Sequence, residues 1–420
     1  MDGSGAPAWP ARPGASLAPR RPWAGRRVLL GVTGGIAAYK SIQLARDLAR
    51  LGAEVDVVLT HSAKAFVGPL SFEGLTGRPV YSDLVAEGHA LDHIRLARAA
   101  DVVCVAPATA DFIARAAAGR ADDLITAVLL ATRVPVLVCP AMNDRMWAHA
   151  QTQANAAHLE SLGYTLVGPA TGPLAWDEGS GPGRMVEPDV ILEHIGRALS
   201  PPGPLTGKHV VVSAGPTREP VDAVRVLTNR SSGRMGYAIA AAAWRRGARV
   251  TLISGPTEIA PPAGVDVVRA ETAADMERAV RAALPEADAL VMAAAVSDFR
   301  PAAPHAGKLK KEQAPDAIPL EASPDVLRVT RDARPSHLVA VGFALESSDG
   351  VANARAKLES KTLDLIVLNP AGEEGAGFET DTNRVTLISR EGEEALPLQS
   401  KADVAETIMD RVADLMGRRR

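Results

Sequence analysis

Short apolar runs alternate with helical patterns twice along the chain. Strand-like runs occupy residues 27–32, 55–59, 102–106, 134–139 and 164–167, and helical patterns lie between them, notably at 122–132 and 152–162. The second half repeats the alternation at 209–214, 250–253, 288–293, 338–342 and 363–368, then adds a strand pair near 384–388 and 395–398 and a last helix at 402–416. Near-continuous apolar strands separated by helices indicate parallel sheets covered on both faces. We therefore predict an α/β fold of two doubly wound, Rossmann-like domains.

The proline-rich stretch at residues 200–204 interrupts this alternation and predicts an interdomain linker. We expect a first domain at 25–199, the linker at 200–207 and a second domain at 208–420, which suits a chain of 420 residues. Residues 1–24 are rich in Pro, Arg and Ala and have no apolar segment typical of a signal peptide. We predict a disordered extension there.

Composition narrows the class of protein. The net charge of -3 argues against nucleic acid as a partner. No apolar run reaches the ~20 residues of a membrane span. Cys104 and Cys139 each lie inside an apolar strand-like run, which predicts reduced core residues and not a disulfide or metal pair. These features favour a cytoplasmic metabolic protein.

A long polar loop opens the second half, between the run at 209–214 and a helical pattern at 237–246. It contains Gly215, Asn229, Gly233 and Gly236. Glycines let the main chain approach a bound group, and the N–H groups at a helix start favour an anion. The loop favours a nucleotide or phosphate site over a purely structural turn.

The first strand of the chain also ends in a glycine turn, at residues 31–38. This turn lacks the glycine spacing of the dinucleotide fingerprint, and it narrowly misses the P-loop pattern. Lys40 and Ser41 stand at the right distance after Gly34, but Tyr39 occupies the second required glycine position. From the residues alone, a mononucleotide phosphate site and a plain tight turn remain equally open.

Small and polar residues follow two further strands, at 106–111 and 140–147. The carboxyl ends of parallel strands share one edge of a sheet, so both segments should converge with the glycine turn. Asn143 offers a paired donor and acceptor for a carboxylate or amide. Histidine is the residue type that ordinarily titrates near neutrality, so His93 is a candidate base, although any one of nine histidines is more often structural.

The second half carries a comparable group of candidates. Residues 293–300 end a strand, and Lys308, Lys310 and Lys311 follow on a loop. Three clustered lysines are more often a solvated patch, but beside a glycine loop they can also neutralise a triphosphate.

Several of these motifs resemble motifs of known enzyme families, and they follow one another along the chain in the order found in those families. Residues 31–40, the His93 segment and the segments at 106–111 and 140–147 resemble flavoprotein 4'-phosphopantothenoylcysteine decarboxylases. Residues 214–236 resemble phosphopantothenate–cysteine ligases. Over roughly residues 25–416 the chain is therefore similar to the bifunctional decarboxylase–ligase family of coenzyme A biosynthesis.

The resemblance implies FMN in the first domain and assigns roles there. The implied FMN-binding residues are Thr33, Gly34, Gly35, Thr60, Ala106, Pro107, Ala108, Thr109 and Ala110. His93 is the implied catalytic base, and Asn143 the implied holder of the substrate carboxylate. Oxidation of the substrate thiol through FMN gives an electron sink beside the scissile bond, and the hydride returns after decarboxylation.

The resemblance also implies a CTP-dependent ligation of cysteine to 4'-phosphopantothenate through an acyl-cytidylate. Asn229 would support formation of that intermediate and Lys308 its attack by cysteine. The implied CTP contacts are Asp298, Lys308, Ser323, Pro324, Phe343, Lys357 and Lys361, and Mg²⁺ is expected with CTP although no ligand cluster identifies its protein contacts. Relatives have trimeric flavin domains and dimeric ligase domains, so a homo-oligomer is expected.

One departure from the family pattern concerns the flap at residues 174–185. Many relatives carry a proton-donating cysteine there, and this chain has none. Asp177 or Glu178 can replace the cysteine as proton donor if burial raises the pKa of its carboxyl. It is an equal alternative that both are solvated loop carboxylates without such a role. A flavin-binding but catalytically weak first domain beside an active ligase is therefore the alternative function.

Overall fold

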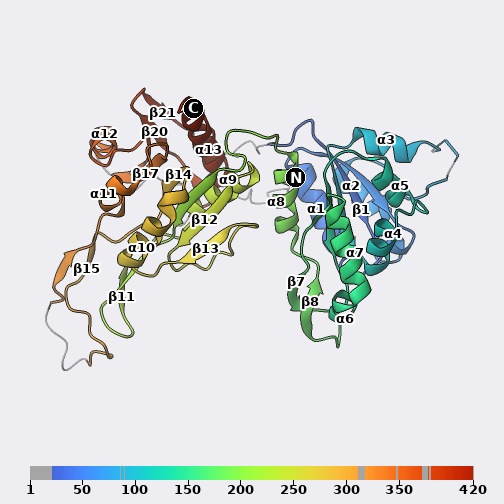
Figure 1. The fold of residues 1–420 in the computed structure, drawn as a ribbon, viewed down its shortest axis with the longest axis horizontal. Coiled ribbons are helices and arrows are strands. Elements are labelled where there is room, and N and C mark those ends of the chain that lie inside the picture. The colour runs from blue at the N-terminus through green and yellow to red at the C-terminus, as the bar shows by residue number, and fades with distance from the viewer. Residues whose placement is uncertain are drawn as a thin grey trace, which may run out of the picture.

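The computed structural model describes residues 21–85, 87–88, 90–310, 317–346, 349–370, 377 and 380–419. They form two α/β lobes, one from each half of the chain, joined through α8 and the segment after it (Figure 1). The predicted class of two parallel-sheet domains is confirmed. Residues 1–20 of the predicted extension and Lys311 lie outside the described residues.

The first lobe is a six-stranded parallel sheet in the order β3-β2-β1-β4-β5-β6. Its strands are β1 (Arg27–Val32), β2 (Glu54–Leu59), β3 (Val80–Tyr81), β4 (Val102–Ala108), β5 (Val136–Pro140) and β6 (Thr165–Leu166). Its helices are α1 (Ala38–Arg50), α2 (Pro69–Thr76), α3 (Asp92–Ala99), α4 (Ala110–Ala117), α5 (Leu124–Ala131), α6 (Asp144–Ala148), α7 (Ala150–Ser161) and α8 (Pro188–Leu199). The strand order reverses between β1 and β4, and open sheets bind ligands at the carboxyl ends of such strands.

The second lobe has an eight-stranded sheet in the order β13-β12-β9-β14-β17-β18-β20-β21, whose last two strands are antiparallel. The strands are β9 (His209–Ala214), β12 (Arg249–Ser254), β13 (Asp266–Arg269), β14 (Ala289–Met292), β17 (Val339–Glu346), β18 (Leu365–Pro370), β20 (Thr386–Ser389) and β21 (Glu393–Ala395). The helices are α9 (Arg234–Arg245), α10 (Ala273–Ala283), α11 (Val326–Val329), α12 (Gly350–Ser360) and α13 (Lys401–Arg418). Here the strand order reverses between β9 and β14.

Short hairpins extend from both lobes. The first lobe carries β7 (Ala170–Pro173) with β8 (Ser180–Arg184), which is the predicted flap. The second lobe carries β10 (Arg218–Pro220) with β11 (Val226–Thr228), β15 (Phe299–Pro301) with β16 (Leu320–Ala322), and β19 (Thr382–Asn383) with β22 (Gln399–Ser400). Strands of two to five residues are too short to show an alternating pattern, which is why the strands of these hairpins were not predicted.

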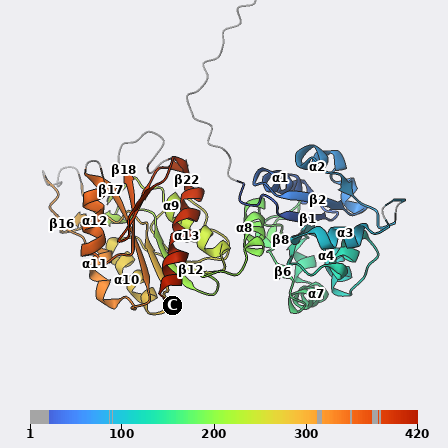
Figure 2. The same ribbon diagram turned by 90° about the horizontal axis from the view of Figure 1, so that it is seen from above.

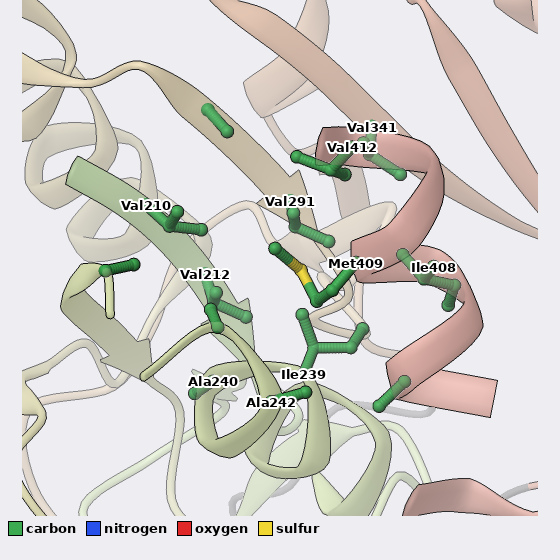
Figure 3. Packing of buried hydrophobic residues seen from close by; sticks show 14 of the residues in the cluster. Val210, Val212, Ile239, Ala240, Ala242, Val291, Val341, Ile408, Met409 and Val412 are labelled. Carbon is green, nitrogen blue, oxygen red and sulfur yellow. The ribbon is translucent and has the colours of Figure 1, made fainter. Parts of the chain in front are cut away.

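Each sheet is covered by helices whose small residues permit close packing. In the second lobe, Ala240 and Ala242 of α9 and Met409 of α13 pack on Val210 and Val291 of the sheet (Figure 3). All five side chains are fully buried, and burying a Val or Met side chain stabilises the fold by about 1.5–3 kcal/mol. Cys104 and Cys139 are buried free cysteines, as predicted.

The lobes meet where α8 lies against α9 (Figure 2). The guanidinium of Arg197 lies 4.6 Å from the ring centroid of Trp244 and donates a hydrogen bond to the Trp244 carbonyl. Arg245 bonds to Glu193 of α8 on one side and to Glu406 of α13 on the other. Leu205, within the predicted linker, is 1% exposed and belongs to the core of the second lobe.

Candidate functional site

Thr33 joins the ends of the two strands that flank the first reversal of strand order. Its hydroxyl donates to the Pro107 carbonyl at 2.8 Å and accepts from the Thr109 N–H at 3.1 Å. The side chain is buried, so these bonds form away from water. The turn after β1 is thereby fixed to the turn after β4.

The neighbouring glycine requires a close approach of two loops. A Cβ on Gly34 would lie 2.3 Å from the Cβ of Ser62, a distance that only a residue without a side chain avoids. Thr60 precedes this contact; its N–H donates to Val32 at 3.0 Å and its hydroxyl accepts from Ala63. The ends of β1 and β2 are therefore held together as well.

Thr109 completes this cradle at the start of α4. Its hydroxyl accepts from the N–H of Phe112 as the helix N-cap, and its methyl carbon lies 3.6 Å from the position of a Cβ on Gly35. The first N–H groups of α4 then face the same edge, where helix N-termini favour a phosphate. The structure thus brings together all nine residues predicted to bind FMN. They are Thr33, Gly34, Gly35, Thr60, Ala106, Pro107, Ala108, Thr109 and Ala110.

Lys40, the residue that made the turn resemble a P-loop, has a different role. Its ammonium group donates to the Met185 carbonyl at 3.2 Å and to the Glu187 carboxylate at 2.9 Å. This hydrogen bond holds the pKa of Glu187 below its usual value. Lys40 therefore anchors the end of the flap and the residues just after it to α1.

Asn143 lies between the cradle and the flap. The preceding Ala141 donates its N–H to the Ala108 carbonyl at 3.0 Å, and Met142 donates to Gly183 of the flap at 2.9 Å. Gly183 has a φ of 147°, and a Cβ there would lie 2.3 Å from the Met142 carbonyl oxygen. Asn143 caps α6 through its side-chain oxygen, which leaves its amide N–H groups available to a carboxylate.

The flap tip is exposed to solvent. Trp176 is 98% exposed, and Asp177 and Glu178 are also exposed. The described residues therefore supply none of the burial that the proton-donor role of Asp177 or Glu178 requires.

His93 lies apart from the other residues assigned to decarboxylation. Its Nδ1 atom is buried and has no hydrogen-bond partner among the described residues. His93 is one of the residues that line a pocket together with Leu84, Ile94 and Leu130. Figure 1 shows α3, which carries His93, and α6, which Asn143 caps, at opposite ends of the lobe. One chain thus does not bring these two residues together.

A second glycine cradle lies at the end of β9. Gly215 and Gly233 have positive φ angles of 77° and 79°, and a Cβ on Gly233 would lie 3.2 Å from the Cα of Gly215. A Cβ on Gly236 would lie 2.5 Å from the Cβ of Ala214. The start of α9 can therefore pack directly on the end of β9, with its N–H groups facing the edge of the sheet.

Asn229 ties this cradle to the end of β14, because its side-chain N–H donates to the Ala295 carbonyl at 2.9 Å. Further along the same segment, the Asp298 carbonyl accepts from the N–H of Ser323 at 2.8 Å. The hydroxyl oxygen of Ser323 is buried without a partner among the described residues. Asn229, Asp298, Ser323 and Pro324 are thus linked around one edge, with a hydroxyl available to a ligand.

Two of the three lysines assigned to CTP, Lys357 and Lys361, border the same edge. Lys361 forms an ion pair with Asp325 at 2.9 Å, directly after Pro324. Lys357 bonds to Glu346 at 2.6 Å and holds the pKa of that carboxyl below its usual value. Phe343 is half-buried on β17 and packs against the core formed with α9 and α13, on the face of the sheet opposite α12. Both ammonium groups are thus oriented by carboxylates that a triphosphate can replace.

Lys308 is exposed and stands before Leu309, whose main chain is bonded to the β10–β11 hairpin. The described residues contain no group of three or more His, Cys, Asp or Glu side chains arranged to hold a metal ion. None of the described helices is long and apolar enough to cross a membrane.

Thr217 is a residue of the second cradle that the sequence analysis did not single out. It is fully buried, and its hydroxyl accepts from the N–H of Ser297 at 3.0 Å. Its place two residues after Gly215, in the glycine loop, is the sequence signal that could have identified it.

Comparison with known families agrees with this two-lobed arrangement. The family described as Flavoprotein matches residues 17–200, and the DNA/pantothenate metabolism flavoprotein C-terminal domain matches residues 205–416. The chain is thus a two-domain protein in which a flavoprotein domain precedes a domain of the pantothenate-metabolism type.

Curated relatives match both domains together. The chain is 44% identical over 398 residues to the coenzyme A biosynthesis bifunctional protein CoaBC of Vibrio vulnificus, covering 94% of this chain and 99% of the relative. It is 45% identical over 407 residues to the protein of the same name from Mycobacterium tuberculosis, covering 93% and 97%. The chain belongs to the CoaBC family of bifunctional coenzyme A biosynthesis proteins.

Solved structures resemble each domain separately. The C-terminal domain of a CoaBC protein is 35% identical, with a TM-score of 0.45, and the match covers 51% of this chain and 99% of that one. The FMN-dependent cysteine decarboxylase SpaF is 34% identical, with a TM-score of 0.34, and the match covers 38% and 91%.

Proposed function

We propose that this chain converts 4'-phosphopantothenate to 4'-phosphopantetheine in two successive reactions. The second domain ligates cysteine to 4'-phosphopantothenate at the expense of CTP, and the first domain decarboxylates the product with FMN. The observation that carries this proposal is a glycine cradle at each reversal of strand order, in a chain whose family joins the same two domains. Two buried free cysteines support a cytoplasmic site of action.

In the ligation, a carboxylate oxygen of 4'-phosphopantothenate attacks the α-phosphorus of CTP and pyrophosphate leaves. The cysteine amine then attacks the acyl carbon, and CMP leaves. We assign Asn229 to the first step and Lys308 to the second, because both carry hydrogen-bond donors suited to developing negative charge. Asp298, Ser323, Pro324, Phe343, Lys357 and Lys361 would hold CTP, whose phosphates would bring Mg²⁺ with them.

In the decarboxylation, the cradle from Thr33 to Ala110 would hold FMN through main-chain N–H groups at the start of α4. The chemistry that FMN supplies when bound is reversible two-electron oxidation of the substrate thiol. The amide of Asn143 would orient the substrate carboxylate, and His93 would remove a proton.

The separation of His93 from Asn143 supports a homo-oligomer in which the decarboxylation site is shared. A site assembled by one copy alone would lack one of the two groups. We therefore propose that each decarboxylation site contains His93 from one copy, and the FMN cradle and Asn143 from another copy.

A second candidate function follows from the flap. It has no cysteine, and Asp177 and Glu178 are exposed. On this alternative the first domain binds FMN but decarboxylates weakly, and the ligase is the principal activity.

Mass spectrometry of the purified protein with 4'-phosphopantothenate, cysteine, CTP and Mg²⁺ tests both candidates. Accumulation of 4'-phosphopantetheine establishes the two-step reaction. Accumulation of 4'-phosphopantothenoylcysteine establishes the ligase and the alternative role of the first domain. The absence of both products contradicts the proposal.

A further inference from the structure

The tip of the β10–β11 hairpin contains a buried carboxylate whose role the proposed reaction does not explain. The side chain of Asp222 is fully buried, although Arg225 beside it is about half exposed. One carboxylate oxygen accepts from the N–H groups of Val224 at 2.8 Å and Arg225 at 2.7 Å. These two bonds close the turn and explain the role of one of the two carboxylate oxygens.

The other oxygen of Asp222 bonds outside the turn. It accepts from the Arg225 guanidinium at 2.9 Å and from the N–H of Leu309 at 3.1 Å, 87 residues away in the sequence. The same guanidinium donates to the Leu309 carbonyl at 3.0 Å. Both main-chain polar groups of Leu309 are therefore bonded to one Asp–Arg pair. The bond to Arg225 also holds the pKa of Asp222 well below its usual range, so the carboxylate is ionised at neutral pH.

The segment held in this way is the one that carries Lys308. It is attached a second time four residues earlier, where the His305 N–H donates to the Val221 carbonyl at 3.0 Å. Residues 302–308 are exposed, so apolar burial does not hold them in place. Lys308 thus lies between two hydrogen-bonded anchors on the hairpin tip. Figure 1 shows β11 and β15 leaving the sheet on the same side of the lobe.

The other end of the same hairpin carries Asn229. The strand β11 ends at Thr228, whose hydroxyl donates to the Thr217 carbonyl at 2.7 Å, and Asn229 follows at once. The hairpin therefore connects the residue assigned to acyl-cytidylate formation with the segment assigned to attack by cysteine.

We propose that Asp222 is a positioning residue for the cysteine-transfer step, because it fixes the Lys308 segment to the hairpin that carries Asn229. The inference rests on the proposed role of Lys308, but the anchoring itself does not. An Asp222 that served only its own turn would need no bond to Leu309.

The variant Asp222→Asn tests this assignment with little change in shape. An amide has one acceptor oxygen, and its N–H groups would face the donors of Arg225 and Leu309. We expect trypsin to cleave after Lys308 or Lys310 about 10-fold faster than in the unmodified protein, because losing hydrogen bonds to a charged group releases the segment. The cleaved peptides are quantified by mass spectrometry, which requires no enzymatic activity.

The kinetic readout separates the two half-reactions. In Asp222→Asn we expect cysteine-dependent CMP release to fall about 10- to 100-fold, while pyrophosphate release without cysteine changes less than about 3-fold. The matched control is Asp275→Asn, since Asp275 also pairs with an arginine three residues later but lies on α10. It should change neither cleavage nor CMP release.

Unchanged tryptic cleavage in Asp222→Asn would overturn the proposal, as would an equal loss in both half-reactions. If Asp222→Asn does not fold, the variant Arg225→Lys tests the proposal instead. A lysine keeps the positive charge but lacks the second guanidinium N–H group that reaches the Leu309 carbonyl. It should show the same pattern at smaller amplitude. An unmodified protein without CTP-dependent activity would contradict the proposed function, while the cleavage comparison would still decide the anchoring.

Discussion

The ammonium group of Lys40 lies 2.9 Å from the carboxylate of Glu187, although 147 residues separate them. The lysine side chain is 8% exposed and the glutamate 50%, so one partner of the pair is shielded from water. Glu187 also bonds to Arg184, the last residue of strand β8 in the flap. The orientation of the flap is therefore tied to the first helix of the flavoprotein domain.

This pair predicts the outcome of Lys40→Met. Without the ammonium group, the end of the flap loses its anchor, so we expect decarboxylation to fall about 10-fold, in line with the loss of a charged hydrogen bond. Bound flavin, measured by its absorbance, should remain because Lys40 bonds to Met185 and Glu187 and not to the cradle. The control Lys208→Met removes an ion pair with Asp288 in the other domain. Loss of flavin from Lys40→Met would instead identify Lys40 as a phosphate ligand.

The separation of His93 from Asn143 predicts complementation between copies. Each of His93→Asn and Asn143→Ala should abolish carbon dioxide release and leave CMP formation intact, because the ligase cradle is in the other domain. Coexpression of the two variants should restore part of the decarboxylase activity, since some shared sites then contain both native residues. Failure to restore any activity, with both proteins folded, would show that each copy assembles its own site.

The close packing of α9 on β9 predicts a severe effect of Gly236→Ala. The added Cβ would lie 2.5 Å from the Cβ of Ala214 and 2.9 Å from the Ser213 carbonyl, so the start of α9 has to move. We expect ligase activity to fall at least about 10-fold and the domain to lose about 1–3 kcal/mol of stability, measured by denaturant unfolding. Gly392→Ala is the control, because nothing lies within 4 Å of the added atom. Equal behaviour of the two variants would refute the packing argument.

The domain contact predicts a pH dependence of stability through His194. The imidazole packs edge-on against Trp244 with ring centroids 4.9 Å apart, and burial lowers the pKa of His194 below its ordinary value. The unfolded chain therefore binds a proton more readily than the folded one. The contribution of His194 is complete above pH ~6.5 and declines as the pH falls toward the lowered pKa of the folded state.

Thermal unfolding of His194→Gln, measured from pH 7.5 to 5.5, checks this prediction. The variant should lose less stability over that interval than the unmodified protein. The control His158→Gln, which alters an exposed histidine of α7, should retain the original slope. An unchanged slope in His194→Gln would mean that the contact does not persist in solution.

The strands and their shared edges could be predicted from the sequence because the information is local. The strands β1 and β9 are runs of apolar residues between a polar residue and a glycine turn, and both begin and end where predicted. The convergence of Thr33 with Thr109 follows from parallel strands alone, since their carboxyl ends must meet.

Contacts between distant segments could not be predicted in this way. The pattern around Lys40 indicates a helix near a glycine turn, but its partner Glu187 depends on how the flap returns to α1. The position of His93 relative to Asn143 depends on which end of the sheet each connection reaches. Likewise, nothing near Asp222 in the sequence indicates a bond to Leu309.

Leu205 has a practical consequence for dividing this protein into fragments. The residue fills part of the ligase core although it precedes the first strand of that domain by four positions. An expression fragment that begins at Lys208 would lack the Leu205 side chain. The resulting cavity in the apolar core of the ligase domain would promote aggregation. A fragment boundary between Pro201 and Pro204 keeps Leu205 with the ligase domain whose core it completes. Even with that boundary, removal of the first domain would expose the Trp244 ring to water in the isolated ligase domain.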